Sequence, residues 1–186
     1  MALFWTSDPH YFHGNIIKYC NRPFENWWEM NETLIRNHNA VVRPDDEIWL
    51  LGDISFGQPN KTEEVLKRLN GRKHLIYGNH DKEIRKKPFL QAYFETIQEY
   101  KELSVSHQGK NYFIVMCHYP FETWNRSGHG SWNFHGHVHS RFEERNRDKR
   151  RLDVGVDTPH CRFFPISLSQ IINIMDKKEI KNSENY

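Results

Sequence analysis

The sequence of 186 residues has no long apolar run. Because no stretch of about 18 consecutive apolar residues is present, we expect no transmembrane helix. The start of the chain also lacks the basic segment and extended apolar stretch of a secretory signal, so none is expected. Cysteine is scarce: Cys20, Cys117 and Cys161 lie far apart and form no C-x-x-C pair. Such separated cysteines favour reduced thiols and a cytoplasmic location.

Neither sign of charge dominates, since 26 lysines and arginines face 24 aspartates and glutamates for a formal net charge of +2. This balance gives no broad basic surface, so nucleic acid as a partner is allowed but not favoured. The chain also lacks an internal repeat and a linker rich in glycine, serine or proline. We therefore expect one domain over residues 1–186, with a polar tail from about residue 176 that frays.

Short apolar runs and helix-start signals alternate in the first half of the chain. Residues 2–6, 48–51 and 74–77 have the composition of buried strands. The capping-box patterns Asn26-x-x-Glu29 and Asn60-x-x-Glu63 predict helices between these strands, and a further helix is expected within residues 82–94. This alternation predicts a largely parallel sheet.

The second half is richer in strand signals. Residues 103–106 and 112–117 flank Gln108-Gly109-Lys110 as in a hairpin, and residues 132–135 and 152–156 indicate further strands. The pattern Ser167-x-x-Gln170 predicts a closing helix. The highly charged residues 141–151 are interpreted as a solvated hairpin loop. Together the two halves predict an α/β fold with two packed sheets and helices outside them.

Histidine is abundant, with 12 residues, and several lie in short clusters beside aspartate and asparagine. The clusters come at the ends of predicted strands. Because the carboxyl ends of strands in α/β folds converge on one edge, we expect these side chains to meet. The clusters are Asp8-Pro9-His10, Gly52-Asp53, Gly78-Asn79-His80-Asp81, His118 and Gly136-His137-Val138-His139.

The clusters combine carboxylate, amide and imidazole groups and contain no thiolate. This chemistry suits borderline divalent transition metals better than calcium or a structural zinc site built from cysteines. The candidate ligands are too many for one tetrahedral ion and suffice for two ions if one carboxylate bridges them. We expect two divalent transition-metal ions, with manganese preferred and iron, zinc, nickel or cobalt as alternatives. The candidate ligands are Asp8, His10, Asp53, Asn79, His118, His137 and His139.

The order D-x-H, G-D, G-N-H-D, H and G-H-x-H, over about residues 3–156, resembles the calcineurin-like metallophosphoesterase superfamily, in its small members without a cap. The resemblance implies a four-layer α/β/β/α sandwich of two mixed sheets flanked by helices. Pro9 departs from the usual residue at its position but removes no ligand. The resemblance divides the ligands between two metals with Asp53 as the bridge: Asp8, His10, Asp53 and His139 for one, and Asp53, Asn79, His118 and His137 for the other.

A reaction follows from this resemblance. A hydroxide that bridges two metals can attack phosphorus, so no protein nucleophile is required. The resemblance places His80 toward the substrate, where it can protonate the leaving alkoxide as a general acid. Asp81 is expected to hydrogen-bond the other ring nitrogen of His80. Arg22 and Arg126 lie in loops expected near the same edge and are candidates for binding a phosphate oxygen, whereas Asp157 is interpreted as structural.

The favoured function is a metal-dependent phosphodiesterase acting on a phosphoester substrate, either nucleotide-derived or another diester. The sequence does not distinguish a cyclic nucleotide from an oligonucleotide end, a dinucleotide or a protein phosphate. The chain has no insertion large enough for a substantial cap, and the resulting open pocket suits a diester. The alternatives are a phosphomonoesterase or protein phosphatase, a nuclease, and a non-catalytic interaction module that has lost its ligands. Because all the ligand positions and His80 are filled, the sequence argues against the last alternative. It leaves the oligomeric state open.

Overall fold

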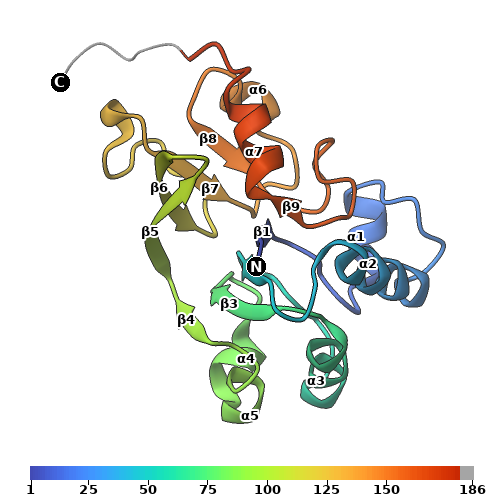
Figure 1. Cartoon of the computed structure of the whole chain (residues 1–186). Helices are drawn as coiled ribbons and strands as arrows, with labels where there is room; N and C mark the ends of the chain where they lie inside the picture. Colours follow the sequence, from blue (N-terminus) through green and yellow to red (C-terminus); the bar gives the residue numbers. More distant parts are fainter. Residues whose placement is uncertain (181–186) are drawn as a thin grey trace.

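The computed structural model describes residues 1–180 and contains two β-sheets with helices around them (Figure 1). The strands of the first sheet, in spatial order, are β4 (Thr96–Gln98), β3 (Arg72–Ile76), β2 (Glu47–Leu50), β1 (Leu3–Thr6) and β9 (Ile166–Ser167). The strands of the second sheet, in spatial order, are β5 (Tyr100–His107), β6 (Lys110–Cys117), β7 (Trp132–His135) and β8 (Arg151–Asp153). The two sheets with flanking helices confirm the expected α/β class.

The first sheet is parallel from β1 to β4, as the alternating pattern predicts. Its register aligns Trp5 with Trp49, and Trp49 with His74. The short β9 pairs antiparallel with β1, which makes the sheet mixed. The parallel order brings the ends of β1, β2 and β3 to the same edge, and each of these ends leads into a polar cluster.

The helices between these strands are α1 (Gly14–Tyr19), α2 (Trp27–Val41) and α3 (Pro59–Arg68). The α2 helix begins as predicted, since the Asn26 side chain accepts a hydrogen bond from the Glu29 amide at 3.0 Å. The predicted capping box at Asn60 is wrong. Pro59 already occupies the first helical position, for which its fixed φ is well suited, and no side chain caps this helix.

Residues 82–94 hold two short helices, α4 (Lys82–Lys86) and α5 (Pro88–Gln91). The break falls at Lys87, the residue before a proline, where helical geometry is disfavoured. The closing helix α7 (Leu168–Met175) has the capping box predicted for Ser167 and Gln170. None of the helices within residues 1–180 has the length and apolarity needed to cross a membrane.

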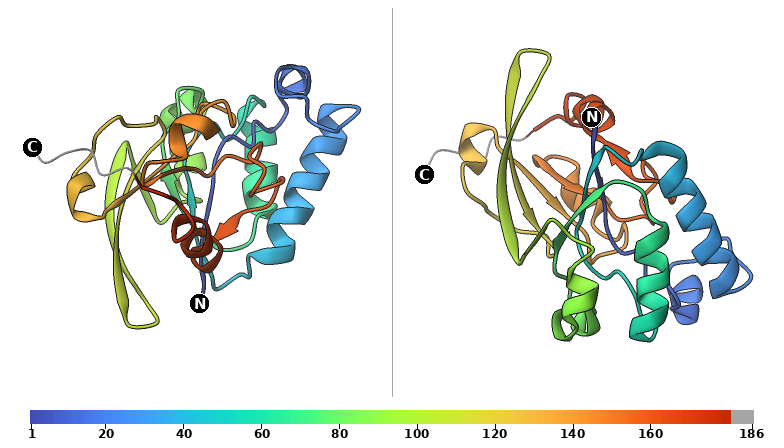
Figure 2. Two further views of the ribbon diagram at one scale, coloured as in Figure 1. Left: turned by 90° about the horizontal axis from the view of Figure 1, so that it is seen from above. Right: turned by 60° about the horizontal axis from the view of Figure 1, so that its bottom comes forward.

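The second sheet begins with the predicted hairpin, in which β5 and β6 pair antiparallel. The hairpin turns at Gln108 and Gly109, both with positive φ, and its tip projects from the rest of the fold (Figure 2). The remaining pairs, β6 with β7 and β7 with β8, are parallel. The strand predicted over residues 152–156 is shorter, because β8 ends at Asp153 and Gly155 makes only an isolated bridge to Ser7.

The interpretation of residues 141–151 as a solvated hairpin loop is wrong. A short helix, α6 (Glu143–Asn146), lies there, and a 3₁₀ turn, η1 (Ser127–His129), precedes β7. Arg151 is buried and its guanidinium donates to the side chain of Asn146 at 2.7 Å. Lys178 donates to the carbonyl of Asn146, which ties down the start of the tail that was expected to fray. Residues 181–186 of that tail lie outside the described residues.

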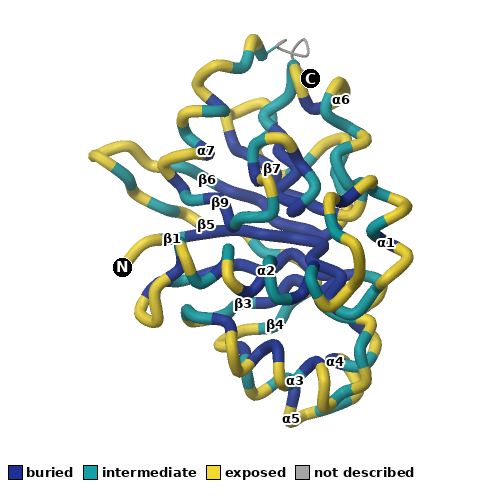
Figure 3. The backbone as a smooth tube through the Cα atoms, turned by 90° about the vertical axis from the view of Figure 1, so that its right-hand side faces the viewer, coloured by how far each residue is buried: buried dark blue, intermediate teal, exposed yellow. Residues whose placement is uncertain are grey.

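Apolar side chains form two cores. The first lies between the first sheet and helices α2 and α3, and contains Leu34, Ile48 and Leu66. The second joins the two sheets through Trp5 and Phe134, whose rings meet edge to face at 5.3 Å. Figure 3 shows these buried strands running through the middle of the molecule, with exposed backbone around them. The loops that follow the strands are therefore anchored on a rigid base.

Candidate metal centre

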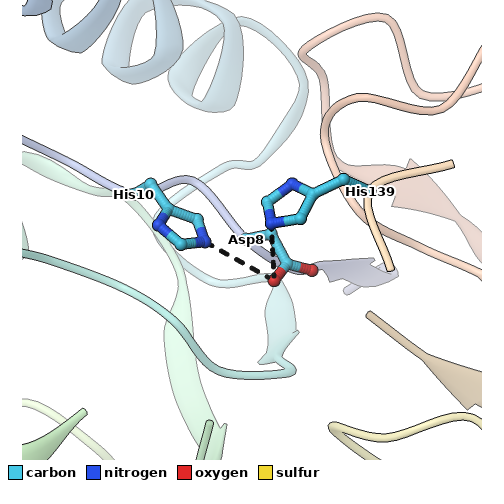
Figure 4. A group of neighbouring side chains, drawn as sticks. All are labelled: Asp8, His10 and His139. Carbon is cyan, nitrogen blue, oxygen red and sulfur yellow. Dashed lines mark ion pairs between the residues drawn. The ribbon is translucent and has the colours of Figure 1, made fainter. Parts of the chain in front are cut away.

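The side chains of Asp8, His10 and His139 converge from segments far apart in the sequence (Figure 4). The Oδ1 atom of Asp8 lies 3.8 Å from Nε2 of His10 and 3.9 Å from Nε2 of His139. Asp8 Oδ1 and His10 Nε2 are buried and have no hydrogen-bond partner. Unpaired buried polar atoms are costly, and a cation between these three ligand atoms would satisfy them. The donor set, one carboxylate and two imidazoles, suits a transition metal.

The other carboxylate oxygen of Asp8 is fixed by the loop after β7. Oδ2 accepts a hydrogen bond from the amide of His137 at 2.9 Å. A Cβ at Gly136 would overlap with Ser7 Oγ and Asp8 Oδ2, so only glycine permits this approach. The glycine of the G-H-x-H motif thus lets the protein hold one oxygen of Asp8 and leave the other for a ligand.

A second group adjoins the first and consists of Asp53, His118 and His137, with Asn79 beside it. The Oδ2 atom of Asp53 lies 3.5 Å from Nε2 of His118 and 3.6 Å from Nε2 of His10. One carboxylate oxygen therefore faces imidazoles of both groups, as a bridging ligand requires. The amide oxygen Oδ1 of Asn79 lies 3.2 Å from Nε2 of His118. The structure brings all the candidate ligands together.

Most of these ligand positions have strained backbone. Left-handed φ values are uncommon for residues other than glycine and cost about 1–3 kcal/mol each. Such strain is concentrated at functional sites because the surrounding fold must hold it in place. The candidate ligands with positive φ are Asp8 (57°), His10 (53°), Asp53 (55°), His137 (69°) and His139 (47°).

The imidazoles and carboxylates of the cluster shift one another's pKa values. Burial lowers the pKa of His118, but its contact with Asp53 and the negative charges of Asp8 and Asp53 outweigh burial and raise the pKa to about 9. Burial would raise the pKa of Asp8, but its neighbouring histidines hold that pKa below its ordinary value. The Nδ1 atom of His118 donates to the carbonyl of Leu51 at 2.7 Å, which turns Nε2 toward the site. To ligate a cation, Nε2 of His118 would have to be free of its proton.

His139 is oriented by a buried ion pair. Its Nδ1 donates to Oδ2 of Asp157 at 2.7 Å, and Arg22 donates to both oxygens of Asp157 at 2.7 and 2.8 Å. Arg22 also donates to the carbonyls of Asp8 and Pro9, each at 2.8 Å. Because Arg22 is buried and its donors are engaged, it positions the ligand loops and does not have the free guanidinium expected for binding substrate.

Cys20 lies beside His139 and Asp157, and these three residues form another group with ligand-type atoms. Both carboxylate oxygens of Asp157 already accept hydrogen bonds from Arg22. We therefore interpret this group as support for His139, in line with the structural role expected for Asp157.

Asp81 does not make the expected hydrogen bond to His80. Its Oδ2 accepts from the amides of Gly78 at 2.7 Å and Asp53 at 3.0 Å, and its Oδ1 accepts from the amide of Ile54 at 2.8 Å. The buried carboxylate is thus turned inward, toward the loop after β2. Asp81 fixes the backbone of Asp53 and leaves the imidazole of His80 free of it.

His80 lies at the open side of the cluster. Its side chain is 43% exposed, and Nε2 lies 4.0 Å from Oδ2 of Asp53. Its amide donates to Oδ1 of Asp53 at 2.8 Å, which fixes the residue beside the carboxylate. The imidazole can therefore reach a molecule bound at the cluster.

Arg126, the other arginine expected to contact substrate, is placed elsewhere. Its guanidinium lies 4.6 Å from the ring centre of Phe113 and lines a surface cavity of about 340 Å³ together with Ser131. Phe113 lies within β6, and His118 directly follows the end of this strand. Five residues separate the two, which corresponds to about 16 Å along an extended strand. The loop after His118 folds back along β6, and this return carries Arg126 away from the ligands.

Two exposed aromatic residues at the site were missed from the sequence. Phe56 stacks on His13 at 3.9 Å and on His10 at 5.1 Å, and Tyr119 contacts the rings of His118 and His137 edge to face. The available signal was their position, since Phe56 follows Asp53 by three residues and Tyr119 follows His118 directly. Aromatic residues within three positions of a candidate ligand in the sequence are expected at the same edge of the sheet as that ligand.

Comparisons with known proteins agree with this geometry. The family model described as calcineurin-like phosphoesterase matches residues 1–158. An uncharacterized protein of Methanocaldococcus jannaschii, MJ1445, is 35% identical over 189 residues, covering 98% of this chain and 96% of that protein. The gene 66 protein of Mycobacterium phage L5 is 29% identical over 184 residues, covering 84% of this chain and 87% of that protein.

A solved structure has the same fold. The crystal structure of AQ665, a protein of unknown function from Aquifex aeolicus, matches with a TM-score of 0.69 at 26% identity. The match covers 93% of this chain and 98% of the other. Since the family model spans most of the sequence and the ligand motifs converge in space, the chain belongs to the calcineurin-like phosphoesterase family.

Proposed function

We propose that this protein is a metal-dependent phosphodiesterase that holds two divalent transition-metal ions, with manganese preferred. Family membership supports metal-dependent hydrolysis of a phosphoester. The observation that carries the proposal is the position of Asp53 Oδ2, which faces His118 of one ligand group and His10 of the other. The unpaired atoms of Asp8 and His10 give a second reason for a cation at this point.

Each ion would be held by its own set of ligands, and one carboxylate would be shared. Asp8, His10 and His139 would hold one ion, His118, His137 and Asn79 the other, and Asp53 both. When bound, the two ions supply Lewis-acid stabilisation of the phosphate oxygens and lower the pKa of a water molecule. The ligand loops are held in place by Asp81 and by the Arg22–Asp157 pair, so the ligand atoms are oriented before the ions bind.

His80 is assigned to proton donation. In hydrolysis a water molecule gives up one proton to solvent and forms an oxygen–phosphorus bond, the bond from phosphorus to the leaving oxygen breaks, and the leaving oxygen takes a proton. The exposed imidazole of His80, fixed beside Asp53 by its amide, can provide that proton. His80 is then reprotonated from solvent.

The preference for a diester rests on the charges available to the substrate. A monoester carries up to two negative charges at neutral pH, and enzymes commonly meet them with arginine. Here Arg22 is neutralised by Asp157, and Arg126 lies on Phe113. The singly charged phosphate of a diester needs no such additional cation, and a nucleotide-derived diester is the substrate class we propose.

The proposal is tested by a substrate and metal screen. Protein stripped with a chelator is reloaded with manganese, iron, zinc, nickel or cobalt and assayed with bis-p-nitrophenyl phosphate and p-nitrophenyl phosphate. We expect the diester to be hydrolysed faster, with manganese giving the highest rate. Faster hydrolysis of the monoester with every metal contradicts the proposal. The Asp53→Asn variant controls for contaminating phosphatases, because it lacks the shared negative charge.

A further inference from the structure

Phe56 occupies a defined place between the ligand cluster and solvent. Its ring lies nearly parallel to the ring of His13, at 3.9 Å and 18°, and to that of ligand His10, at 5.1 Å and 20°. It also lies 4.6 Å from the ring of His80. Phe56 nevertheless remains 41% exposed. A large apolar ring thus faces solvent beside the residue assigned to proton donation.

The backbone holds this ring in its exposed position. The amide of Phe56 donates to the carbonyl of Tyr11 at 2.9 Å, and Ser55 and Tyr11 form an isolated β-bridge. The next residue, Gly57, packs so closely on Phe12 that a Cβ would collide with the Phe12 ring. Because the neighbouring backbone is fixed on both sides, the ring stays on the site edge and does not turn into the core.

The exposed aromatic surface continues outward from the site. Tyr19 is exposed and lies edge to face with His13 at 6.3 Å, and Trp27 lies 5.4 Å from Phe12. An aromatic face accepts a planar group by stacking, which is worth about 1–3 kcal/mol for a nucleic-acid base and depends little on which base is present. Phe56 is the member of this surface that touches both a metal-ligand candidate and His80.

We propose that Phe56 is a stacking platform for the base of a nucleoside attached to the substrate phosphate. The inference rests on the proposed function for the location of the phosphate and adds the chemical class of the group beside it. The base packs on the exposed part of Phe56, and its sugar connects it to the phosphate held at the ligand cluster. Phe56 is therefore a residue that determines specificity.

Tyr119 is the alternative platform, beside the second ligand group. It is exposed, but its ring meets His118 and His137 edge to face, at 5.1 and 4.8 Å. It does not contact His80 in any described ring pair, whereas Phe56 does. We therefore assign the base to Phe56, and a Tyr119 variant separates the two sites.

The test compares two sugar phosphates, one with a base and one in which a hydroxyl group takes the place of the base. Manganese-loaded protein is titrated by calorimetry with adenosine 5′-phosphate and with ribose 5-phosphate, and the ratio of their Kd values reports the contribution of the base. We expect adenosine 5′-phosphate to bind about tenfold more tightly. Phe56→Leu should reduce this ratio to near one, while Phe56→Tyr, which keeps a ring, should retain it. Phe89→Leu, at an exposed phenylalanine of α5, serves as the matched control and should retain the ratio.

Two results overturn the inference: a wild-type ratio near one, or a ratio unchanged in Phe56→Leu. If the ratio is unchanged in Phe56→Leu and lost in Tyr119→Leu, the base binds at Tyr119 instead. Circular dichroism of each variant shows whether the fold is retained. Because the ratio compares two ligands on the same preparation, a general weakening of phosphate binding does not imitate the effect. Hydrolysis of bis-p-nitrophenyl phosphate by the same wild-type preparation tests the proposed function separately, since base preference is read from binding alone.

Discussion

Arg22 and Asp157 form a buried, two-point ion pair between segments 135 residues apart. Asp157 also accepts the Nδ1 proton of His139, and Arg22 holds the carbonyls of Asp8 and Pro9. The pair therefore connects both sides of one ligand group. A carboxylate that accepts from a ligating histidine fixes the ring orientation and makes the other ring nitrogen a better ligand.

Replacing Asp157 with asparagine should weaken the metal group that contains His139. Asparagine keeps the size of the side chain but removes the negative charge that both Arg22 and His139 contact. We expect a loss of about 10- to 100-fold in manganese affinity at one of two sites, measured by calorimetry. Asp45→Asn, at an exposed carboxylate, is the matched control and should bind like the wild type. Equal affinity in Asp157→Asn and wild type contradicts this role.

Asp81 is expected to stabilise the fold and to hold Asp53 in position, because its carboxylate accepts hydrogen bonds from buried backbone amides. Asp81→Asn replaces one acceptor oxygen with an NH₂ group, which then faces a backbone amide donor. Leaving such buried groups unpaired should lower the free energy of unfolding by about 2–3 kcal/mol, measured by urea denaturation of the metal-free protein. If the variant is as stable as the wild type, the Asp81 carboxylate does not contribute these buried hydrogen bonds to stability.

His80 should affect the reaction according to the leaving group. His80→Ala should retain both metals, yet slow diesters with poorly acidic alcohol leaving groups by about 10²- to 10⁴-fold. Hydrolysis of p-nitrophenyl diesters should fall much less, because p-nitrophenolate leaves without a proton. Equal losses for both classes of leaving group are inconsistent with proton donation by His80.

The stability of the fold should decrease at acid pH through His38, a buried residue of α2. Burial lowers the pKa of this histidine from 6.5 to about 4, although its Nε2 donates to the carbonyl of Asn70 at 2.9 Å. Because the unfolded chain binds the proton more readily, stability is lost as the pH falls from 6.5 toward 4, by up to about 3 kcal/mol.

Urea unfolding of the metal-free protein at pH 7.5 and pH 5 measures this effect. In His38→Gln, whose amide can still donate to Asn70, the difference between the two pH values should be smaller than in the wild type. The comparison removes the contributions of the other histidines, which both proteins share. The same pH dependence in both proteins shows that His38 does not titrate as inferred.

The sequence predicted the site best where a ligand-type residue comes directly after a strand. Strands followed directly by Asp8, Asp53 or Asn79 predict a shared edge, because parallel strands point their ends the same way. Local capping predicts the start of α2 from Asn26 equally well. These inferences need only nearby residues and the regular geometry of strands and helices.

The errors at the candidate metal centre concern partners that only the tertiary fold determines. Arg22 finds Asp157 across 135 residues, and nothing in the local pattern indicates that the pair is buried. Asp81 adjoins His80 in sequence but turns toward the backbone of Asp53. Arg126 follows His118 closely in the chain, yet its loop returns along β6 to Phe113.

Manganese titration of metal-free protein tests the central claim most directly. We predict two bound ions per chain in the wild type, and at most one in Asp53→Asn, which loses the carboxylate oxygen facing both histidine groups. Wild-type protein that binds fewer than two ions at saturation, or an Asp53→Asn variant that still binds two with unchanged affinity, contradicts the shared two-metal site.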